Sequence, residues 1–397
     1  MKIATIVRGY LPAPRPDDMI YAPIDLAIAI TEKLVERGHT VDYYGPIGSH
    51  LRASNVVTLN QRARVKNYEE FAQLLGDSDM LAHNAPGMWD NFFVREMFER
   101  AAKGEYDLLH FHHPEMALPY VHLYPNVPVV YTLHDPVTPW MKELLETYMT
   151  PNQYFISISN NQRQAAPDLP YVATVYNGID MNRFAYSEEK HDDYLLFAGR
   201  IVPEKGVKGA IQVAQQTDKQ LFIIGRVYPD QQGYFDQHIR PHLNEKILYL
   251  GFVAQEQVVR YYQKASAFMM PIQWEEPFGL TMAEAMACGT PVLALRRGSV
   301  PEVVEDGKTG FVVDTLSDMA AAVSKLDQIR PEDCHAHVVE HFSAEIMVDH
   351  YERVFEEILR GTQPEGADDA AARSATVLRE SLKRGAERAR NLLRRKQ

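Results

Sequence analysis

The sequence predicts an α/β protein made of two doubly wound parallel sheets that face each other across a cleft. Short runs of β-branched and aromatic residues alternate with helical segments along most of the chain, a pattern typical of parallel strands joined by crossover helices. The strand segments are apolar on both faces, as expected for a sheet covered on both sides. The alternation pauses between residues 178 and 192, where a polar stretch follows an Asn-Gly pair, and this pause predicts a domain boundary.

Each half of the chain supplies its own elements. In the first half we expect a helix at residues 24–37 and strands at 2–7, 39–45, 106–112, 127–135 and 153–159. In the second half we expect helices between strands at 193–199, 221–225, 247–252, 267–272, 291–295 and 309–313. An apolar stripe at helical spacing predicts a further helix that closes the structure across both domains. The predicted units are domains at 1–185 and 186–342, a closing helix at 343–361 and a tail at 362–397.

The composition excludes several classes of protein. The 397 residues are 46% hydrophobic and carry a formal net charge of -12, so we expect no nucleic-acid partner. No apolar run has the length of a membrane span, and a Pro-rich turn stands where a signal peptide would have its apolar segment. The two cysteines, Cys288 and Cys334, are too few for a disulfide framework or a four-cysteine zinc site. We therefore expect a cytoplasmic protein.

Residues 274–311 carry the densest set of chemically useful side chains. A Pro-Phe-Gly turn at 277–279 directly precedes a helix expected from Leu280, and the free amides of a helix N-terminus favour a phosphate. Glu276 lies in the turn, facing the open cleft, and Glu284 lies about one turn into the helix. A carboxylate accepts hydrogen bonds from sugar hydroxyl groups. Either glutamate alone would be expected to lie in solvent, but with the turn between them we interpret one as a ribose ligand and the other as a ligand of a transferred sugar.

A second candidate set follows the strand at 193–199. This strand ends in a glycine that is followed by Arg200, with Lys205 five residues further on. Two cations at the carboxyl end of a strand can neutralise a diphosphate, Arg200 as a fork and Lys205 as a point charge. Taken alone, the pair is equally consistent with two surface cations on a loop.

Histidines end two neighbouring strands of the first half. His110, His112 and His113 end one strand and His134 ends the next. With two nearby carboxylates they suggest a metal site, but alternate residues of a strand point to opposite faces and no helical His-Glu pair supports a cage. We expect no metal, and we interpret these histidines as hydrogen-bonded groups or as groups that contact a donor substrate.

Other motifs are weaker or absent. Asp77 and Asp79 have the Asp-x-Asp form that can hold a divalent ion with a diphosphate, but they follow a helix-like run and we interpret them as a surface turn. The chain lacks the glycine fingerprints of dehydrogenases and P-loop ATPases, and it lacks a Gly-x-Ser-x-Gly nucleophile elbow. These absences disfavour the corresponding enzyme classes.

The motifs of the second half resemble a known family. Residues 274–311, with GRIVPEKG at 199–206 and YNGID at 176–180, are similar to the donor domain of the retaining glycosyltransferases of family four. That family has the GT-B fold, in which two Rossmann-like domains face each other. The resemblance covers about residues 1–360 in layout, and its motifs are specific in the second half.

The resemblance implies a set of site residues. In the family pattern Glu276 contacts the donor sugar, Glu284 contacts the ribose, and Arg200 with Lys205 contacts the diphosphate. The histidine near the sugar ring corresponds to His134. The implied donor-binding residues are Arg200, Lys205, Val253, Glu276, Phe278, Gly279, Leu280 and Glu284. The implied catalytic residues are His134, Arg200, Lys205 and Glu276.

The first half departs from the family pattern in one loop. Many relatives have a Gly-Gly loop between the first strand and the first helix, where this chain has LPAPRPDDMIYAP. The side chains of Asp17, Asp18 and Met19 keep the backbone farther from a phosphate than glycine would. The acceptor side therefore differs from the family pattern.

The segment after Gly361 changes to a polar, Ala-rich stretch and then to a basic amphipathic one. Basic amphipathic helices bind anionic lipid surfaces, so one hypothesis is peripheral contact with the inner membrane surface. The alternatives are a solvated, partly disordered tail and a helix packed on the acidic body of the protein.

These observations together favour one function. We expect a retaining glycosyltransferase that needs no metal or other cofactor and takes its sugar from a UDP- or GDP-sugar. The acceptor is unknown and is a glycan, a lipid-linked molecule or a small molecule. The alternatives are a nucleotide-sugar epimerase or a phosphorylase on the same fold, and a nucleotide-sugar-binding protein without turnover.

Overall fold

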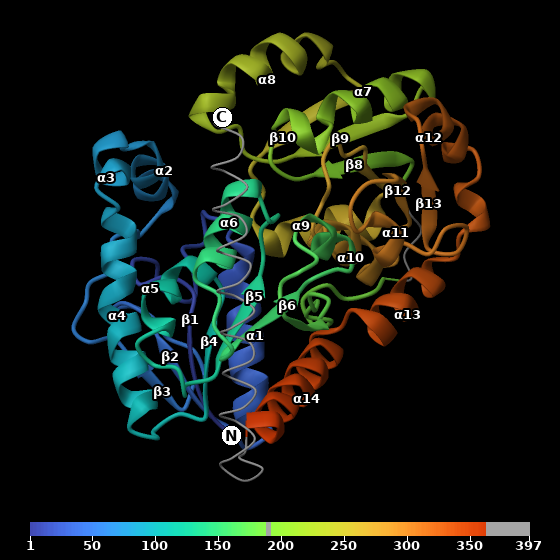
Figure 1. Ribbon diagram of the computed structural model, residues 1–397. Helices are drawn as coiled ribbons and strands as arrows, with labels where there is room; N and C mark the ends of the chain where they lie inside the picture. Colours follow the sequence, from blue (N-terminus) through green and yellow to red (C-terminus); the bar gives the residue numbers. More distant parts are fainter. Residues whose placement is uncertain (188–191, 363–397) are drawn as a thin grey trace, which may run out of the picture.

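Two parallel β-sheets, each covered by helices, form the two halves of the molecule (Figure 1). The computed structural model describes residues 1–187 and 192–362. Within these ranges the first sheet has the strand order β3-β2-β1-β4-β5-β6-β7 and the second has the order β10-β9-β8-β11-β12-β13. This arrangement confirms the predicted fold class. The hypothesis of a membrane-binding tail concerns residues that lie outside the described ones.

The described strands are short and apolar. The first sheet contains β1 (Lys2–Ile6), β2 (Thr40–Tyr44), β3 (Asn55–Val57), β4 (Leu108–Phe111), β5 (Val129–Leu133), β6 (Gln153–Ser157) and β7 (Tyr171–Thr174). The second contains β8 (Tyr194–Ala198), β9 (Gln220–Ile224), β10 (Ile247–Gly251), β11 (Ala267–Met270), β12 (Val292–Leu295) and β13 (Gly310–Val313).

The helices follow the strands in alternation. The first half contains α1 (Ala22–Glu36), α2 (Tyr68–Gly76), α3 (Ser78–Ala82), α4 (Ala85–Ala102), α5 (Leu118–Val121) and α6 (Pro139–Thr147). The rest of the described chain contains α7 (Val207–Gln216), α8 (Gln232–His238), α9 (Gln255–Lys264), α10 (Leu280–Ala287), α11 (Val300–Val303), α12 (Leu316–Val323), α13 (Pro331–His341) and α14 (Ala344–Thr362). None of the helices in the described ranges has the length and apolarity that a membrane span needs.

Each sheet has one point where the winding direction reverses. The first sheet grows from β1 through β2 to β3 and then continues from β4 on the other side of β1. The second sheet does the same at β8, which lies between β9 and β11. Loops at such a switch point diverge and leave a crevice at the carboxyl ends of the strands, where ligands of open α/β sheets bind.

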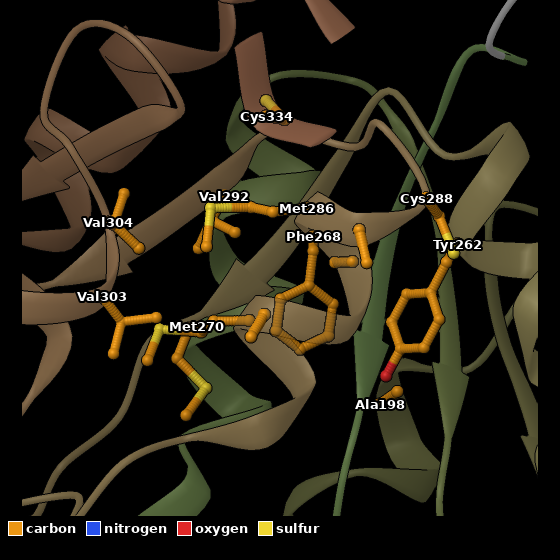
Figure 2. Packing of buried hydrophobic residues seen from close by; sticks show 14 of the residues in the cluster. Ala198, Tyr262, Phe268, Met270, Met286, Cys288, Val292, Val303, Val304 and Cys334 are labelled. Carbon is orange, nitrogen blue, oxygen red and sulfur yellow. The ribbon is translucent and has the colours of Figure 1, made fainter. Parts of the chain in front are cut away.

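Alternate residues of a strand enter different hydrophobic cores. In β8, Leu195 belongs to one core of the second sheet and Leu196 to the other, as the two-residue period of a strand requires. The core that holds Leu196 also contains Tyr262 and Phe268, whose ring centroids lie 5.8 Å apart (Figure 2). The second sheet is therefore buried on both faces, as its apolar strands predict.

The structure corrects the prediction for Asp77 and Asp79, because a short helix begins there. The expected surface turn at Asp77 and Asp79 is the first turn of α3, and Asp77 is the N-cap of that helix. Its Oδ1 accepts hydrogen bonds from the backbone amides of Asp79 and Met80, each at 3.0 Å. Asp77 thus satisfies free amides of a short helix, which is a structural role for this carboxylate.

Helix α14 returns from the second half and packs beside α1 on the first sheet (Figure 1). The chain crosses between the halves where Ile179 and residues 342–344 lie side by side. The amide of Ile179 donates to the carbonyl of Phe342 at 2.8 Å, and the amide of Ala344 donates to the carbonyl of Ile179 at 2.9 Å. From there α14 buries an apolar face that includes Tyr351 and Phe355. The chain therefore crosses between the two domains twice at the same place.

Ion pairs between α1 and α14 should contribute modestly to stability. Arg37 contacts Asp349 at 2.5 Å and Glu352 at 2.7 Å. We expect Arg37→Met to lower the free energy of unfolding by about 1 kcal/mol, because half-exposed pairs are partly screened by water and salt. Urea titration at low and high salt measures this effect. The control is Arg353→Met, which removes an exposed cation from α14, the helix that carries the partners of Arg37; equal midpoints for the two variants would contradict the prediction.

Candidate active site

Loops at the carboxyl ends of the strands of the two sheets contact each other in two places. In one, Nη2 of Arg226 donates to the carbonyl of Asp18 at 2.9 Å, and the guanidinium of Arg226 lies 3.8 Å from the ring centroid of Tyr68. In the other, Glu302 accepts hydrogen bonds from the amides of Asn160 and Asn161 at 2.7 and 2.8 Å. The residues of the candidate site follow strands at these same ends of the sheets.

Lys205 and Glu276 form an ion pair across the switch point of the second sheet. Lys205 follows β8 and Glu276 follows β11, and the Nζ to Oε2 distance is 2.5 Å. The indole Nε1 of Trp274 donates to the same oxygen at 3.0 Å, and the Lys205 ammonium lies 5.1 Å from the centroid of that indole ring. Glu276 is only 7% exposed. The expectation that its side chain faces an open cleft is therefore wrong. Its buried charge is held by the cation and the indole N–H.

The turn that carries Lys205 is held against the turn that carries Glu276. Gly206 has a φ of +78°, and a Cβ at this position would lie 1.8 Å from the carbonyl oxygen of Pro271. The amide of Gln273 donates to the carbonyl of Glu204 at 2.8 Å. Only glycine permits both the left-handed backbone and this close approach. The two turns therefore position the ion pair as one unit.

A loop after β12 fixes the Glu276 turn from the other side. The amide of Gly298 donates to the carboxylate of Glu275 at 2.7 Å, and the amide of Ser299 donates to the carbonyl of Glu276 at 2.9 Å. Gly298 has a φ of +56°, and a Cβ there would lie 2.2 Å from the backbone nitrogen of Glu276. This close packing holds the backbone of Glu276 in one conformation.

Glu284 faces the first domain from the first turns of α10. The helix begins at Leu280, as predicted. The hydroxyl of Tyr262 donates to Oε2 of Glu284 at 3.0 Å. Burial raises the pKa of Glu284 to about 7, against the hydrogen bond from Tyr262 and the positive charge of Arg183. The charges of Asp25, in the first turn of α1, and of Arg15, in the loop before that helix, also act on Glu284.

The other predicted donor ligands differ in exposure. Arg200 is exposed, and it forms no ion pair with another described residue. Val253 is half-buried and packs on the core. The side chain of Phe278 is 2% exposed and points into the core, where its ring lies 5.7 Å from that of Phe342. A ligand contact at Phe278 must therefore come from its backbone, and Phe278 is a structural residue through its side chain.

His134 lies at the end of β5, paired with a second histidine. Its Nε2 is 2.8 Å from Nδ1 of His112, and the two rings stack with centroids 5.1 Å apart. Burial lowers the pKa of His134 to about 3, so its imidazole is neutral at physiological pH. His134 therefore acts as a hydrogen-bonding group and not as a cation. His110 has a separate role, because it bonds Thr132 at 2.9 Å inside the core.

A buried charged group beside these histidines was not predicted. Arg8, directly after β1, contacts Asp90 at 3.0 Å and Glu115 at 2.8 Å. Burial raises the pKa of Asp90 to about 6, against the opposing charge of Arg8. His113 accepts or donates a hydrogen bond to the hydroxyl of Tyr21 at 2.8 Å. The position of Arg8 after the first strand could have indicated a functional residue. Asp90 lies within α4, and the sequence around it gives no such signal.

Asp135 links the two sides of the cleft electrostatically. Burial raises its pKa, the charge of Glu115 raises it further, and the charges of Arg8 and Arg200 oppose that rise. Arg200 belongs to the second domain, so charges from both domains act on Asp135. Among the residues that the structure describes, no group of three or more His, Cys, Asp or Glu side chains has the arrangement of a metal site.

Comparison with known proteins agrees with this architecture. Among curated proteins, the N-acetyl-alpha-D-glucosaminyl L-malate synthase of Bacillus anthracis is 23% identical over 309 residues, which cover 68% of this chain and 80% of that protein. The lipopolysaccharide 1,2-N-acetylglucosaminetransferase of Salmonella typhimurium is 26% identical over 208 residues. That match covers 47% of this chain and 54% of the relative, so the chain spans about half the length of the second protein.

Solved structures share the fold. The sucrose-phosphate synthase of Thermosynechococcus elongatus superimposes with a TM-score of 0.70 at 17% identity and covers 91% of this chain and 100% of its own. Anabaena HepE in complex with UDP and glucose gives a TM-score of 0.63 at 16% identity and covers 90% of this chain and 100% of its own.

Two family matches cover most of the chain between them. Residues 179–337 match the family described as Glycosyl transferases group 1, and residues 26–183 match the one described as Glycosyltransferase Family 4. With these matches and two parallel-sheet domains, the chain belongs to family four of the glycosyltransferases and has the GT-B fold.

Proposed function

We propose that this protein transfers a sugar from a UDP- or GDP-sugar to a hydroxyl group with retention of the anomeric configuration. The observation that carries the proposal is the joined Lys205–Glu276 unit at the donor-side switch point, with Glu284 on the adjoining helix. The complex of the fold relative HepE with UDP and glucose supports a nucleoside diphosphate in this crevice.

The second domain supplies the charges that a leaving diphosphate needs. In the proposed reaction the bond between the anomeric carbon and the β-phosphate oxygen breaks first, and negative charge develops on that oxygen. Arg200, Lys205 and the first amides of α10 stabilise this charge. When Lys205 turns to the phosphate, Glu276 becomes free to accept hydrogen bonds from the hydroxyl groups of the transferred sugar.

The first domain supplies the acceptor face. The acceptor hydroxyl forms the new bond to the anomeric carbon from the side that the leaving group vacates, and its proton passes to the departing phosphate oxygen. Neutral His134, held by His112, offers a hydrogen bond to the sugar. Both bonds to the anomeric carbon therefore lie on one face of the sugar, which accounts for retention.

The donor site tests the proposal directly. We expect UDP or GDP to raise the melting temperature of the protein, and we expect the matching nucleotide sugar to be consumed with retention, as read by NMR of the product's anomeric carbon. Because Arg200 and Lys205 take the place of a metal at the diphosphate, activity should persist in EDTA. Binding without turnover across sugars and acceptors, or an inverted product, would refute the proposed reaction.

A further inference from the structure

A pocket of about 810 Å³ lies in the first domain, at the carboxyl ends of the first three strands of the sheet. Its walls come from three segments: residues 12–17 after β1, residues 47–50 after β2, and residues 62–70 between β3 and the first turn of α2. All three follow the carboxyl ends of parallel strands. The amide of Ile47 donates to the carbonyl of Gln61 at 2.7 Å and ties the second wall to the third. The pocket therefore lies at the end of the sheet from which the loop after β1 contacts the second domain.

The charge of the pocket wall is opposite to that of the whole chain. Arg15, Arg62, Arg64 and Lys66 line it, against the carboxylates of Asp17 and Glu70, in a protein with a formal net charge of -12. A cationic wall of this kind raises the local concentration of anions.

Three of these cations are available to a ligand. Within the described residues, the side chains of Arg62, Arg64 and Lys66 form no ion pair with a carboxylate, and all three are exposed. The guanidinium of Arg64 lies 5.2 Å from the ring centroid of Trp89, which fixes its position on the wall. Glu70, the carboxylate of this segment that lines the pocket, is used locally, because its Oε2 accepts the amide of Lys66 at 2.7 Å at the start of α2.

Arg15 connects the pocket to the donor side. It lines the pocket and also contacts Asp25 at 3.0 Å, and the charges of both act on Glu284 across the cleft. The same loop reaches the second domain through Asp18, whose carbonyl accepts the hydrogen bond from Arg226. A molecule in this pocket therefore lies on the first-domain side of the site where the sugar would be transferred.

We propose that this pocket binds an oxyanion, a phosphate or a carboxylate, on the molecule that accepts the sugar, and that Arg62, Arg64 and Lys66 hold it; this inference rests on the proposed function. Arginine binds both oxyanions through two parallel hydrogen bonds, and lysine adds a point charge. The proline and isoleucine side chains of the other walls leave an apolar surface for the carbon skeleton. The acceptor is therefore an anionic hydroxyl compound.

The experiment uses three probes that share one ring and differ in charge: glucose 6-phosphate, glucuronate and glucose. Each is titrated by calorimetry into the full-length protein at constant ionic strength. We expect saturable binding of the phosphate or the carboxylate and at least tenfold weaker binding of glucose, since one charge-assisted contact is worth about tenfold or more. The phosphate and carboxylate arms show which oxyanion the pocket prefers.

Variants locate the binding. Arg62→Gln/Arg64→Gln/Lys66→Gln should weaken binding of the charged probe by about tenfold or more. A control that removes the same charge elsewhere, Lys103→Gln/Arg260→Gln/Lys325→Gln, should bind like the parent. Arg200→Gln should also bind like the parent, because the proposed function assigns that cation to the donor diphosphate. If the triple variant does not fold, Arg62→Gln alone is used, since that side chain is exposed.

The inference is overturned if no charged probe binds saturably, if glucose binds equally well, or if Arg200→Gln loses binding while the pocket variant keeps it. Binding of UDP and GDP to the same samples separates this inference from the proposed function. If the protein binds nucleotide and transfers sugar but binds no anion, the proposed anion site is wrong and the proposed function is retained. If it binds the anion at the pocket but binds no nucleotide, the proposed function is wrong.

Discussion

Lys205→Ala is expected to lower the rate of sugar transfer by about a hundredfold or more, because a cation beside a developing phosphate charge is worth several kcal/mol of barrier. The structure adds a second cause. Lys205 is the ion-pair partner of the buried Glu276, so its loss leaves an uncompensated carboxylate beside the diphosphate. The matched control is Lys208→Ala, which removes an exposed cation one turn further along and should keep full activity.

A double variant separates catalysis from folding. Lys205→Ala alone should lower the free energy of unfolding by about 3 kcal/mol, since removing one partner of a buried pair strands the other. Lys205→Ala/Glu276→Gln should recover most of that stability, because no buried charge remains, and should stay as inactive as the single variant. Urea unfolding and initial rates on the same preparations measure both quantities. A double variant that regains activity together with stability would show that Lys205 serves only the fold.

Local patterns predicted where the candidate residues of the second domain lie in the fold. Each candidate residue lies within a few positions of a strand end or a helix start: Lys205 after β8, Glu276 after β11 and Glu284 in α10. Motifs this short can be recognised in the sequence alone. The ion pair between Lys205 and Glu276 was not predicted, because it joins turns 71 residues apart whose adjacency depends on β8 and β11 being neighbours in the sheet. Sheet order follows from packing of the whole domain and not from any local pattern.

The first domain was harder to predict, because its edge strands and the loop after its first strand give weak local signals. The edge strands β3 and β7 are three and four residues long and only partly buried, so their hydrophobic pattern is weak. The first-domain charges that act on Glu284 come from Arg15, in the loop where the chain departs from the family pattern, and from Asp25, in the first turn of α1. No family motif indicated that this loop would form both a pocket wall and a contact with the second domain.

Glu284→Gln is expected to change stability and nucleotide binding in opposite directions. Burial raises the pKa of Glu284 from an ordinary value of 4.5 to about 7, so the folded protein holds this proton more tightly than the unfolded chain. The folded state therefore loses stability as pH rises from about 4.5 through 7, where the unfolded carboxyl is already ionised. Glutamine carries no charge, so the variant should resemble its parent in stability near pH 4.5 and exceed it at pH 8.

The same carboxylate should favour nucleotide binding at high pH. Only the ionised form accepts hydrogen bonds from both ribose hydroxyl groups, so parental affinity for UDP or GDP should rise through pH 7, and Glu284→Gln should lack that rise and bind more weakly at pH 8. The nucleotide's own titration is common to both proteins and cancels in the comparison. Glu276→Gln is the contrasting variant: it should keep affinity for the plain nucleotide and lose turnover, because its proposed partner is the transferred sugar.

Calorimetric titration and urea unfolding at two pH values test these expectations together. A buried acidic group that destabilises the fold at neutral pH is typical of a functional site, where the energetic cost is offset by ligand binding. If Glu284→Gln lowers stability at pH 8 and leaves nucleotide affinity unchanged, Glu284 is a structural partner of Tyr262 and not a ribose ligand. If Glu276→Gln is the variant that loses nucleotide affinity, the roles of the two glutamates are reversed.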